Sequence, residues 1–248
     1  MPRAEAWTAE DMPDLSGLTI VVTGGNSGIG YEAALQFARK NAQVILACRS
    51  VDKASAAAKQ IIASYPGAKA EVMALDLSSL SSIRSFAGLF HSSHRTLDVL
   101  VNNAGVMALP YRRTEDGFEM QFGTNHLGHF ALTGLLLDAL LTREGARVVN
   151  VASGAHRMGR IRFDDLQWEH RYYKWLAYGQ SKLANLLFNL ELQRRADAAG
   201  VKLLAVACHP GYAATNLQGA GPRLQGSSGM ELFWRMTNSA FAQSSAMG

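Results

Sequence analysis

The chain has 248 residues, 48% of them hydrophobic, and a formal net charge of +4, which suits one large core in a single α/β domain over residues 1–248. The sequence contains no run of about 18 apolar residues, so it predicts no membrane span, and the polar extension at 1–16 does not resemble a signal peptide. The small charge, spread along the chain, argues against nucleic-acid binding. Cys48 and Cys208 lie in apolar runs, so we expect buried thiols in the reduced cytoplasm.

Six short apolar runs alternate along the chain with longer helical patterns. We expect strands at 18–23, 43–47, 70–75, 97–102, 146–152 and 202–208. We expect helices near 28–40, 52–64, 79–92, 115–142 and 174–199. The runs show little polar alternation, which is typical of strands buried on both faces. The order therefore predicts a doubly wound, Rossmann-type parallel sheet of at least six strands, with helices on both faces.

Chemically unusual residues follow each of these runs. They are the glycines at 24–30, Arg49, Asp76, the segment 102–105, Ser153 and the segment 209–211. Ligands of such sheets bind beyond the carboxyl ends of the strands, where the strand order reverses. The pattern predicts one binding site at that edge.

The first run is followed by Gly24-x3-Gly28-x-Gly30 and then by a predicted helix. Glycines allow positive φ and close backbone approach, and a helix N-terminus presents free N–H groups to an anion. This favours pyrophosphate binding, although a tight strand-to-helix turn would need the same glycines.

Four motifs together resemble the short-chain dehydrogenase/reductase family. They are TGGNSGIG (23–30), NNAG (102–105), YGQSK (178–182) and PG (210–211), and they stand in the family's order between about residues 18 and 216. The segments FGTNHLGHFALT (122–133) and VNVASGAH (149–156) resemble the branch with retinol dehydrogenases, WW-domain oxidoreductases and protochlorophyllide reductases. The resemblance implies hydride transfer between a nicotinamide and a carbonyl or alcohol substrate.

Tyr178 and Lys182 lie four residues apart on a predicted helix, so their side chains share one face. An ammonium about 5 Å from the phenol would favour the phenolate by roughly 3 kcal/mol. That would lower the pKa of Tyr178 from about 10 toward 8 and make it an acid–base group near neutral pH. The resemblance adds Ser153 as the donor to the substrate oxygen and Asn125 as support for a water relay to Lys182.

The second run ends where NAD-binding folds usually place an acidic residue for the ribose. Here Cys48 fills that position and Arg49 follows, while Asp52 suits the first turn of a helix after Ser50. Arg49, with Lys53, can pair with a 2′-phosphate. We therefore expect NADP(H), with NAD(H) as the weaker alternative; a merely solvent-facing Arg49 is the other interpretation.

The resemblance implies further contacts with the cofactor. Asp76 and Leu77 should lie by the adenine, the 102–105 backbone along its ribose, and Thr215 near the nicotinamide amide or the phosphates. The full set of expected cofactor residues is Gly24, Asn26, Ser27, Gly28, Ile29, Gly30, Arg49, Asp76, Leu77, Asn102, Asn103, Ala104, Gly105, Tyr178, Lys182, Pro210, Gly211 and Thr215.

The segment 217–238 falls where the family carries a substrate-covering flap, which favours an apolar substrate. The family normally continues to a seventh strand, so this sequence either is truncated before that strand or lacks it. An unpaired sixth strand would be exposed and prone to association, so a homo-oligomer is compatible with the sequence. Aromatic residues between 163 and 175 could line the substrate site or serve packing. The histidines lack a completing ligand set, so we expect no metal.

Two other functions fit the same fold. A non-catalytic NADP(H) sensor would be expected to lose the Tyr–Lys pair, which this chain keeps. A nucleotide-sugar epimerase or dehydratase would need a larger substrate domain than the C-terminal region provides.

Overall fold

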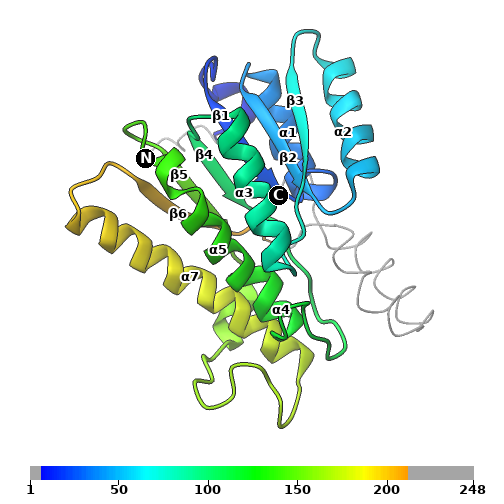
Figure 1. The fold of residues 1–248 in the computed structure, drawn as a ribbon, viewed down its shortest axis with the longest axis vertical. Coiled ribbons are helices and arrows are strands. Elements are labelled where there is room, and N and C mark those ends of the chain that lie inside the picture. Colours follow the sequence, from blue (N-terminus) through cyan, green and yellow to red (C-terminus); the bar gives the residue numbers. More distant parts are fainter. Residues whose placement is uncertain (1–6, 212–248) are drawn as a thin grey trace, which may run out of the picture.

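The computed structural model of the protein describes residues 7–211. Within this range, six parallel strands form one sheet in the order β3-β2-β1-β4-β5-β6 (Figure 1). The strands are β1 (Thr19–Thr23), β2 (Gln43–Cys48), β3 (Lys69–Ala74), β4 (Val99–Asn102), β5 (Arg147–Val151) and β6 (Leu204–Cys208). All six predicted strands are present, with ends shifted by one or two residues, so the predicted Rossmann-type sheet is confirmed.

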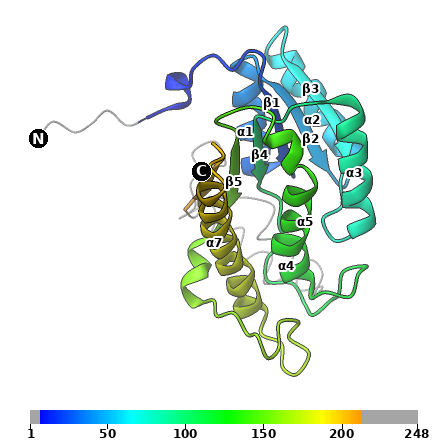
Figure 2. The same cartoon turned by 60° about the vertical axis from the view of Figure 1, so that its left-hand side comes forward.

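Helices cover both faces of this sheet. The α-helices are α1 (Gly28–Arg39), α2 (Val51–Ser64), α3 (Leu80–Ser93), α4 (Met120–Phe122), α5 (Gly128–Leu135), α6 (Leu137–Leu140) and α7 (Lys174–Ala198). Shorter turns are η1 (Ala9–Asp11), the π-helical η2 (Gly123–Leu127) and η3 (Gly154–Met158). Helices α3, α5 and α7 lie on one face, and α1 and α2 on the other (Figures 1 and 2).

Consecutive strand residues belong to different cores. Val21 of β1 packs with Phe86 and Phe90 of α3, whereas its neighbours Ile20 and Val22 pack with α1 and α2. Side chains on a strand alternate between its faces, and here both faces are covered by helices. This is why the strand sequences show no alternation of polar residues.

The single helix predicted over 115–142 is wrong. The chain instead forms α4, η2, α5 and α6 in succession. At η2 the Asn125 side chain bonds to the main chain of Val106, 19 residues earlier, with its Oδ1 accepting from the Val106 N–H at 2.8 Å and its Nδ2 donating to the Val106 carbonyl at 2.9 Å. Such π-helical turns interrupt an α-helix and are frequent at functional sites.

The strand order reverses between β1 and β4, and the loops that follow these two strands meet there. Thr23 Oγ1 accepts hydrogen bonds from the Asn103 and Ala104 N–H groups at 2.9 Å each. Gly24 has φ +67°, and a Cβ on it would lie 3.0 Å from Ala104 Cβ. The glycine is therefore required by close approach of the two loops as well as by its dihedral angle.

Both cysteines were expected to be buried, and the structure confirms this for one of them. Cys48 is buried at the end of β2, but Cys208 is exposed. In the described part of the chain, β6 lies at an edge of the sheet and pairs only with β5, so its residues are covered on fewer sides than those of β2.

Candidate active site

A cavity of about 520 Å³ lies at the carboxyl edge of the sheet and takes residues from the ends of all six strands. Most residues predicted for the cofactor or the chemistry line it. They are Gly24, Asn26, Ser27, Gly28, Ile29, Gly30, Arg49, Asp76, Leu77, Asn103, Ala104, Gly105, Ser153, Tyr178, Lys182, Pro210 and Gly211. Residues scattered from 24 to 211 are thus brought to one place, as the strand-end pattern predicted.

The glycine-rich loop forms one wall of the cavity and leads into α1. Gly24 and Gly28 have φ values of +67° and +58°. Ser27 is the N-cap residue of α1, and its side chain makes no capping hydrogen bond. A Cβ at Gly30 would collide with the Asn103 amide and lie 2.7 Å from Gly24 O. A helix N-terminus without a side-chain cap, set in a tightly packed glycine cradle, fits a phosphate group.

The end of β2 gives the rim of the cavity a positive charge. Arg49 and Lys53 are exposed and line it, and no ion pair among residues 7–211 involves either of them. Burial raises the pKa of the adjacent Cys48 thiol to about 11, so it is neutral at pH 7. This part of the cavity can attract an anion without opposition from Cys48.

Asp76 and Leu77 line the cavity beyond β3. The carboxylate of Asp76 accepts from the Ser78 N–H at 2.9 Å and from the Ser78 hydroxyl at 2.6 Å. The N-cap of α3 is Ser79, whose hydroxyl accepts from the Ser82 N–H. Asp76 therefore shapes the turn before the helix rather than capping it.

Tyr178 and Lys182 lie together on α7, and both are buried, with 4% of each residue exposed. Lys182 Nζ is 5.9 Å from the centre of the Tyr178 ring and donates to the Val151 carbonyl at 2.8 Å. Burial lowers the pKa of Lys182 to about 8. Burial also raises the pKa of Tyr178, against the opposing effect of a hydrogen bond with Ser153.

The predicted lowering of the Tyr178 pKa is therefore wrong, because burial in the folded protein raises this pKa. A nearby ammonium favours the phenolate, but the two effects that act on Tyr178 in the folded chain are burial and the hydrogen bond with Ser153. Removal of the phenol from water disfavours its charged form and exceeds the effect of that hydrogen bond.

Ser153 is the N-cap residue of η3, and its Oγ accepts from the Ala155 N–H at 3.3 Å. The same hydroxyl is bonded to Tyr178 and lines the cavity. The turn-forming and the donor interpretations of this serine are thus compatible.

Asn125 is buried behind the cavity wall rather than lining it. Besides holding Val106, its Nδ2 donates to Ser181 Oγ at 3.0 Å, one residue before Lys182. Its backbone carbonyl lies 3.0 Å from His129 Nδ1. The side chain connects the segment after β4 to the helix with Tyr178 and Lys182.

Asn102 does not fit its predicted contact with the cofactor. It is 2% exposed and absent from the cavity lining. Its Nδ2 donates to Asn150 Oδ1 at 2.9 Å and to Thr133 Oγ1 at 3.2 Å, inside the core. Asn103, the next residue, points the other way and reaches the cavity.

Two histidines beside the site are held by hydrogen bonds within the protein. His126 Nδ1 lies 3.2 Å from Asn185 Oδ1, and His156 Nδ1 lies 2.6 Å from the Ser153 carbonyl. Among residues 7–211, no group of three or more His, Cys, Asp or Glu side chains could hold a metal ion.

Two predictions lie outside the described residues. They are the contact of Thr215 with the cofactor and the substrate flap at 217–238.

A family model described as short chain dehydrogenase matches residues 18–223. The chain belongs to the short-chain dehydrogenase family. Human retinol dehydrogenase 13 is 50% identical over 204 residues, which are 82% of this chain and 61% of that protein. Mouse retinol dehydrogenase 12 is 46% identical over 231 residues, 93% of this chain and 71% of that protein. The resemblance to the retinol dehydrogenase branch is thus confirmed.

Solved structures agree with this placement. An uncharacterised protein from Mycobacterium paratuberculosis superposes with a TM-score of 0.76 at 50% identity, covering 96% of this chain and 81% of that one. A short-chain dehydrogenase from Escherichia coli CFT073, complexed with NADPH, has a TM-score of 0.66 at 26% identity and covers 87% and 84%. The present chain is accordingly a member of this family with a Rossmann-type domain.

In this short-chain dehydrogenase, several lining residues were not in the predicted set. They are Ala47, Cys48, Ser50, Leu75, Val106, Met107, Thr124, Val151, Ala152, Ala155 and Trp175, while Lys53 was expected beside Arg49. Trp175 precedes Tyr178 by three residues, so the helical period alone predicts that both side chains lie on one face of α7. Their rings meet edge to face with centres 6.3 Å apart. Of the aromatic residues between 163 and 175, only Trp175 lines the cavity, while Trp168 is buried and Phe163 is 84% exposed.

No helix among residues 7–211 combines the length and the apolar character that crossing a bilayer requires.

Proposed function

We propose that this short-chain dehydrogenase uses NADP(H) to transfer a hydride between the nicotinamide and an apolar carbonyl or alcohol substrate. One observation carries the proposal: the buried Tyr178–Lys182 pair faces the same cavity as the glycine-rich N-terminus of α1. A phosphate-binding cradle and a proton-transfer group in one cavity are what a nicotinamide-dependent oxidoreductase requires.

The chain's own residues would hold and transfer the proton, while a bound nicotinamide would supply or accept the hydride. Tyr178 would give its proton to the substrate oxygen during reduction, since burial keeps the phenol protonated near neutral pH. Ser153, bonded to Tyr178, would hold that oxygen in place. Lys182 would add positive charge beside the developing oxyanion. Asn125 would act through Val106 and Ser181, which it bonds.

Three features of the rim at β2 support a preference for NADP(H). Arg49 and Lys53 offer two cations to a 2′-phosphate, and Cys48 stays neutral where a carboxylate would repel it. An arginine can form two parallel hydrogen bonds with a phosphate. NADPH bound to the relative from Escherichia coli is consistent with this preference.

The cavity wall near Tyr178 supports an apolar substrate. Val106, Met107 and Trp175 line the cavity together with Tyr178 and Ser153. Apolar lining with few polar groups is typical of sites that bind apolar ligands. The similarity to retinol dehydrogenases points in the same direction, so lipophilic aldehydes and ketones are the substrates to test first.

The decisive experiment measures NADPH oxidation against a panel of lipophilic and small polar carbonyls. We expect Tyr178→Phe to lower kcat by roughly 100-fold or more, because general acid catalysis contributes about 10²- to 10⁴-fold. Tyr173→Phe is the matched control, since Tyr173 lies five residues earlier, is 42% exposed and does not line the cavity. Its kcat should stay within about twofold of wild type.

Equal rates in wild type and Tyr178→Phe would contradict the proposed chemistry. NADPH binding without turnover of any carbonyl or alcohol would instead favour a non-catalytic sensor. Turnover of small polar carbonyls alone would contradict the apolar substrate.

A further inference from the structure

The hydroxyl of Thr23 lies where β1 and β4 end side by side. It accepts from the Asn103 and Ala104 N–H groups at 2.9 Å each, and both of these residues line the cavity. Its third close neighbour is His129 Nε2, also at 2.9 Å. Thr23 is 0% exposed and His129 is 2% exposed, so water does not compete for these contacts.

The contacts of His129 define which ring nitrogen carries the proton. Nδ1 lies 3.0 Å from the Asn125 carbonyl oxygen, which can only accept, so Nδ1 must be the donor. In a neutral ring Nε2 is then an acceptor, and the Thr23 hydroxyl must donate to it. A hydroxyl has one proton and two lone pairs. Thr23 therefore uses all three, and the Val101 carbonyl, at 3.2 Å, is a second and more distant acceptor for the same proton.

A charged His129 does not fit this arrangement. Protonation would direct an Nε2–H group at an oxygen whose two lone pairs are already taken. Burial lowers the pKa of His129 to about 4, and the positive charge of Lys182 acts in the same direction. The ring is therefore a neutral bridge at physiological pH.

The bridge joins two segments that matter for the cavity. On the Nε2 side, Thr23 holds the turn at Asn103 and Ala104. On the Nδ1 side, the Asn125 carbonyl belongs to the π-helical turn η2. The Asn125 side chain in turn bonds Ser181, next to Lys182 on α7. His129 itself does not line the cavity, so it can act only through these neighbours.

We propose that His129, as the Nδ1–H tautomer, is a positioning residue that sets the cofactor-facing turn through Nε2 and the Asn125 turn through Nδ1. The proposal rests on the proposed function, because it takes the cavity as the site of the cofactor and of hydride transfer. The two nitrogens serve different segments, so their losses have different consequences. Loss of the Nε2 contact weakens cofactor binding, and loss of the Nδ1 contact slows turnover.

Two substitutions separate the nitrogens. In His129→Gln the amide oxygen reaches the position of Nε2 and accepts from Thr23, while the Nδ1 donor is lost. In His129→Asn the amide nitrogen takes the position of Nδ1 and donates to Asn125, while the contact with Thr23 is lost. His129→Phe keeps the ring volume and removes both hydrogen bonds.

The dissociation constant of NADPH, measured by fluorescence titration, reports on the Nε2 contact. We expect His129→Gln to stay within about threefold of wild type and His129→Asn to bind roughly tenfold more weakly, as for loss of one buried hydrogen bond. The turnover number at saturating NADPH should show the reverse: roughly tenfold lower in His129→Gln and within about threefold in His129→Asn. His129→Phe should lose both.

Nitrogen-15 NMR of the histidine rings tests the tautomer in the wild-type protein. The resonances missing from His129→Gln identify His129, and we expect an Nδ1–H, non-protonated Nε2 pattern at pH 7. An Nε2–H tautomer or an imidazolium would overturn the proposal. Equal losses of cofactor affinity and turnover in the Gln and Asn variants would also overturn it, since a merely structural role predicts that result.

Failure of the proposed function would look different. If Tyr178→Phe were fully active while the His129 variants still separated NADPH affinity as expected, the proposed acid would be wrong and the Nε2 part of the positioning role would be supported.

Discussion

Burial acts on the charges of Tyr178 and Lys182 in a way that favours proton donation by the tyrosine. It raises the pKa of Tyr178, so the phenol keeps its proton at neutral pH. It lowers the pKa of Lys182 to about 8, so the ammonium form dominates at pH 7 but is lost a little above it. Carbonyl reduction needs the protonated phenol, and the ammonium helps to stabilise the negative charge that forms as the proton leaves.

These directions predict how kcat/KM for carbonyl reduction depends on pH. The lysine is charged below its pKa, so kcat/KM should be constant up to about pH 7.5. It should then fall by about tenfold per pH unit above pH 8, as Lys182 loses its proton. In Lys182→Arg the charge persists, so the decline should move upward by more than about one pH unit. A wild-type profile constant beyond pH 9.5, or an unchanged decline in Lys182→Arg, would contradict this assignment.

The sequence predicted the residues of the site better than their surroundings. The spacing of Tyr178 and Lys182 depends only on the local helical period, so it could be read directly. The partner of Lys182 is the Val151 carbonyl, 31 residues away, and this contact could not be predicted. Asn102 and Asn103 look alike in sequence, but adjacent side chains leave the backbone on opposite sides, and only Asn103 reaches the cavity.

At the scale of elements, strands were predicted well because each is a short apolar run with a distinct composition. The helix expected over 115–142 failed because its interruption depends on tertiary contacts. Asn125 bonds Val106 and Ser181, and no local propensity records either contact. The glycines within that range also differ in role: Gly117 has φ +86°, whereas Gly123 and Gly128 have close neighbours.

Two glycines of α5 make a matched pair for testing this packing. A Cβ at Gly128 would lie 2.5 Å from the Leu77 carbonyl oxygen, whereas a Cβ at Gly134 would meet nothing within 4 Å. Gly128→Ala should destabilise the fold by about 1–3 kcal/mol through overpacking, a fall of about 3–10 °C in Tm. Gly134→Ala should leave Tm unchanged or raise it slightly, because alanine has the higher helix propensity.

Calorimetry on the two variants measures the difference directly. Because Leu77 lines the cavity, Gly128→Ala should also weaken NADPH binding, and Gly134→Ala should not. A similar Tm for both variants would show that the chain beside Leu77 shifts easily to admit the methyl group.

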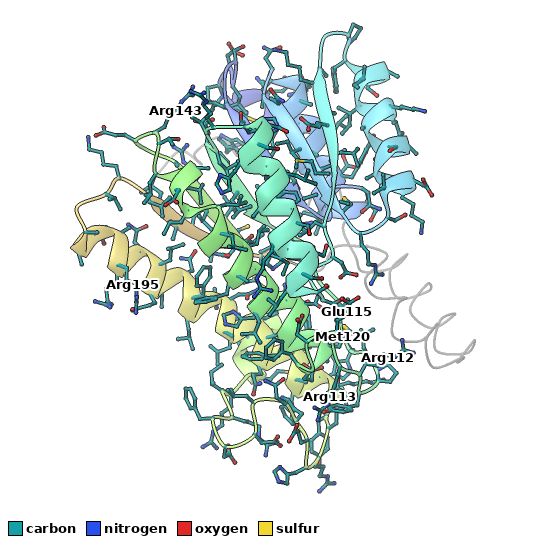
Figure 3. All side chains as sticks on the ribbon, viewed as in Figure 1. Arg112, Arg113, Glu115, Met120, Arg143 and Arg195 are labelled. Atoms are coloured by element: carbon teal, nitrogen blue, oxygen red, sulfur yellow. The ribbon has the colours of Figure 1, made fainter. Side chains whose placement is uncertain are left out.

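At the scale of the whole molecule, the topology of the sheet gathers most residues of the cavity. A parallel sheet brings every strand's carboxyl end to one edge, and the reversal between β1 and β4 opens the space that the cavity occupies. This could be predicted from the order of elements, since right-handed crossovers leave few alternatives. Arg112 and Arg113 lie toward the end of the molecule opposite to Arg143, which is bonded to Asp98 beside the start of β4 (Figure 3).

A ligand held by so many strand ends should stabilise the entire fold, and the gain reports its affinity. At equal saturating concentrations, NADPH should raise Tm about 3–5 °C more than NADH, if the 2′-phosphate contributes about 1.4 kcal/mol, a tenfold difference in affinity. Arg49→Ala should remove that difference while keeping the NADH shift. Arg195→Ala is the matched control, because Arg195 lies on α7, bonded to Glu191 and outside the cavity lining (Figure 3). Equal shifts for both cofactors in wild type would contradict the preference for NADP(H), since the cations at the end of β2 would then contribute nothing to cofactor affinity.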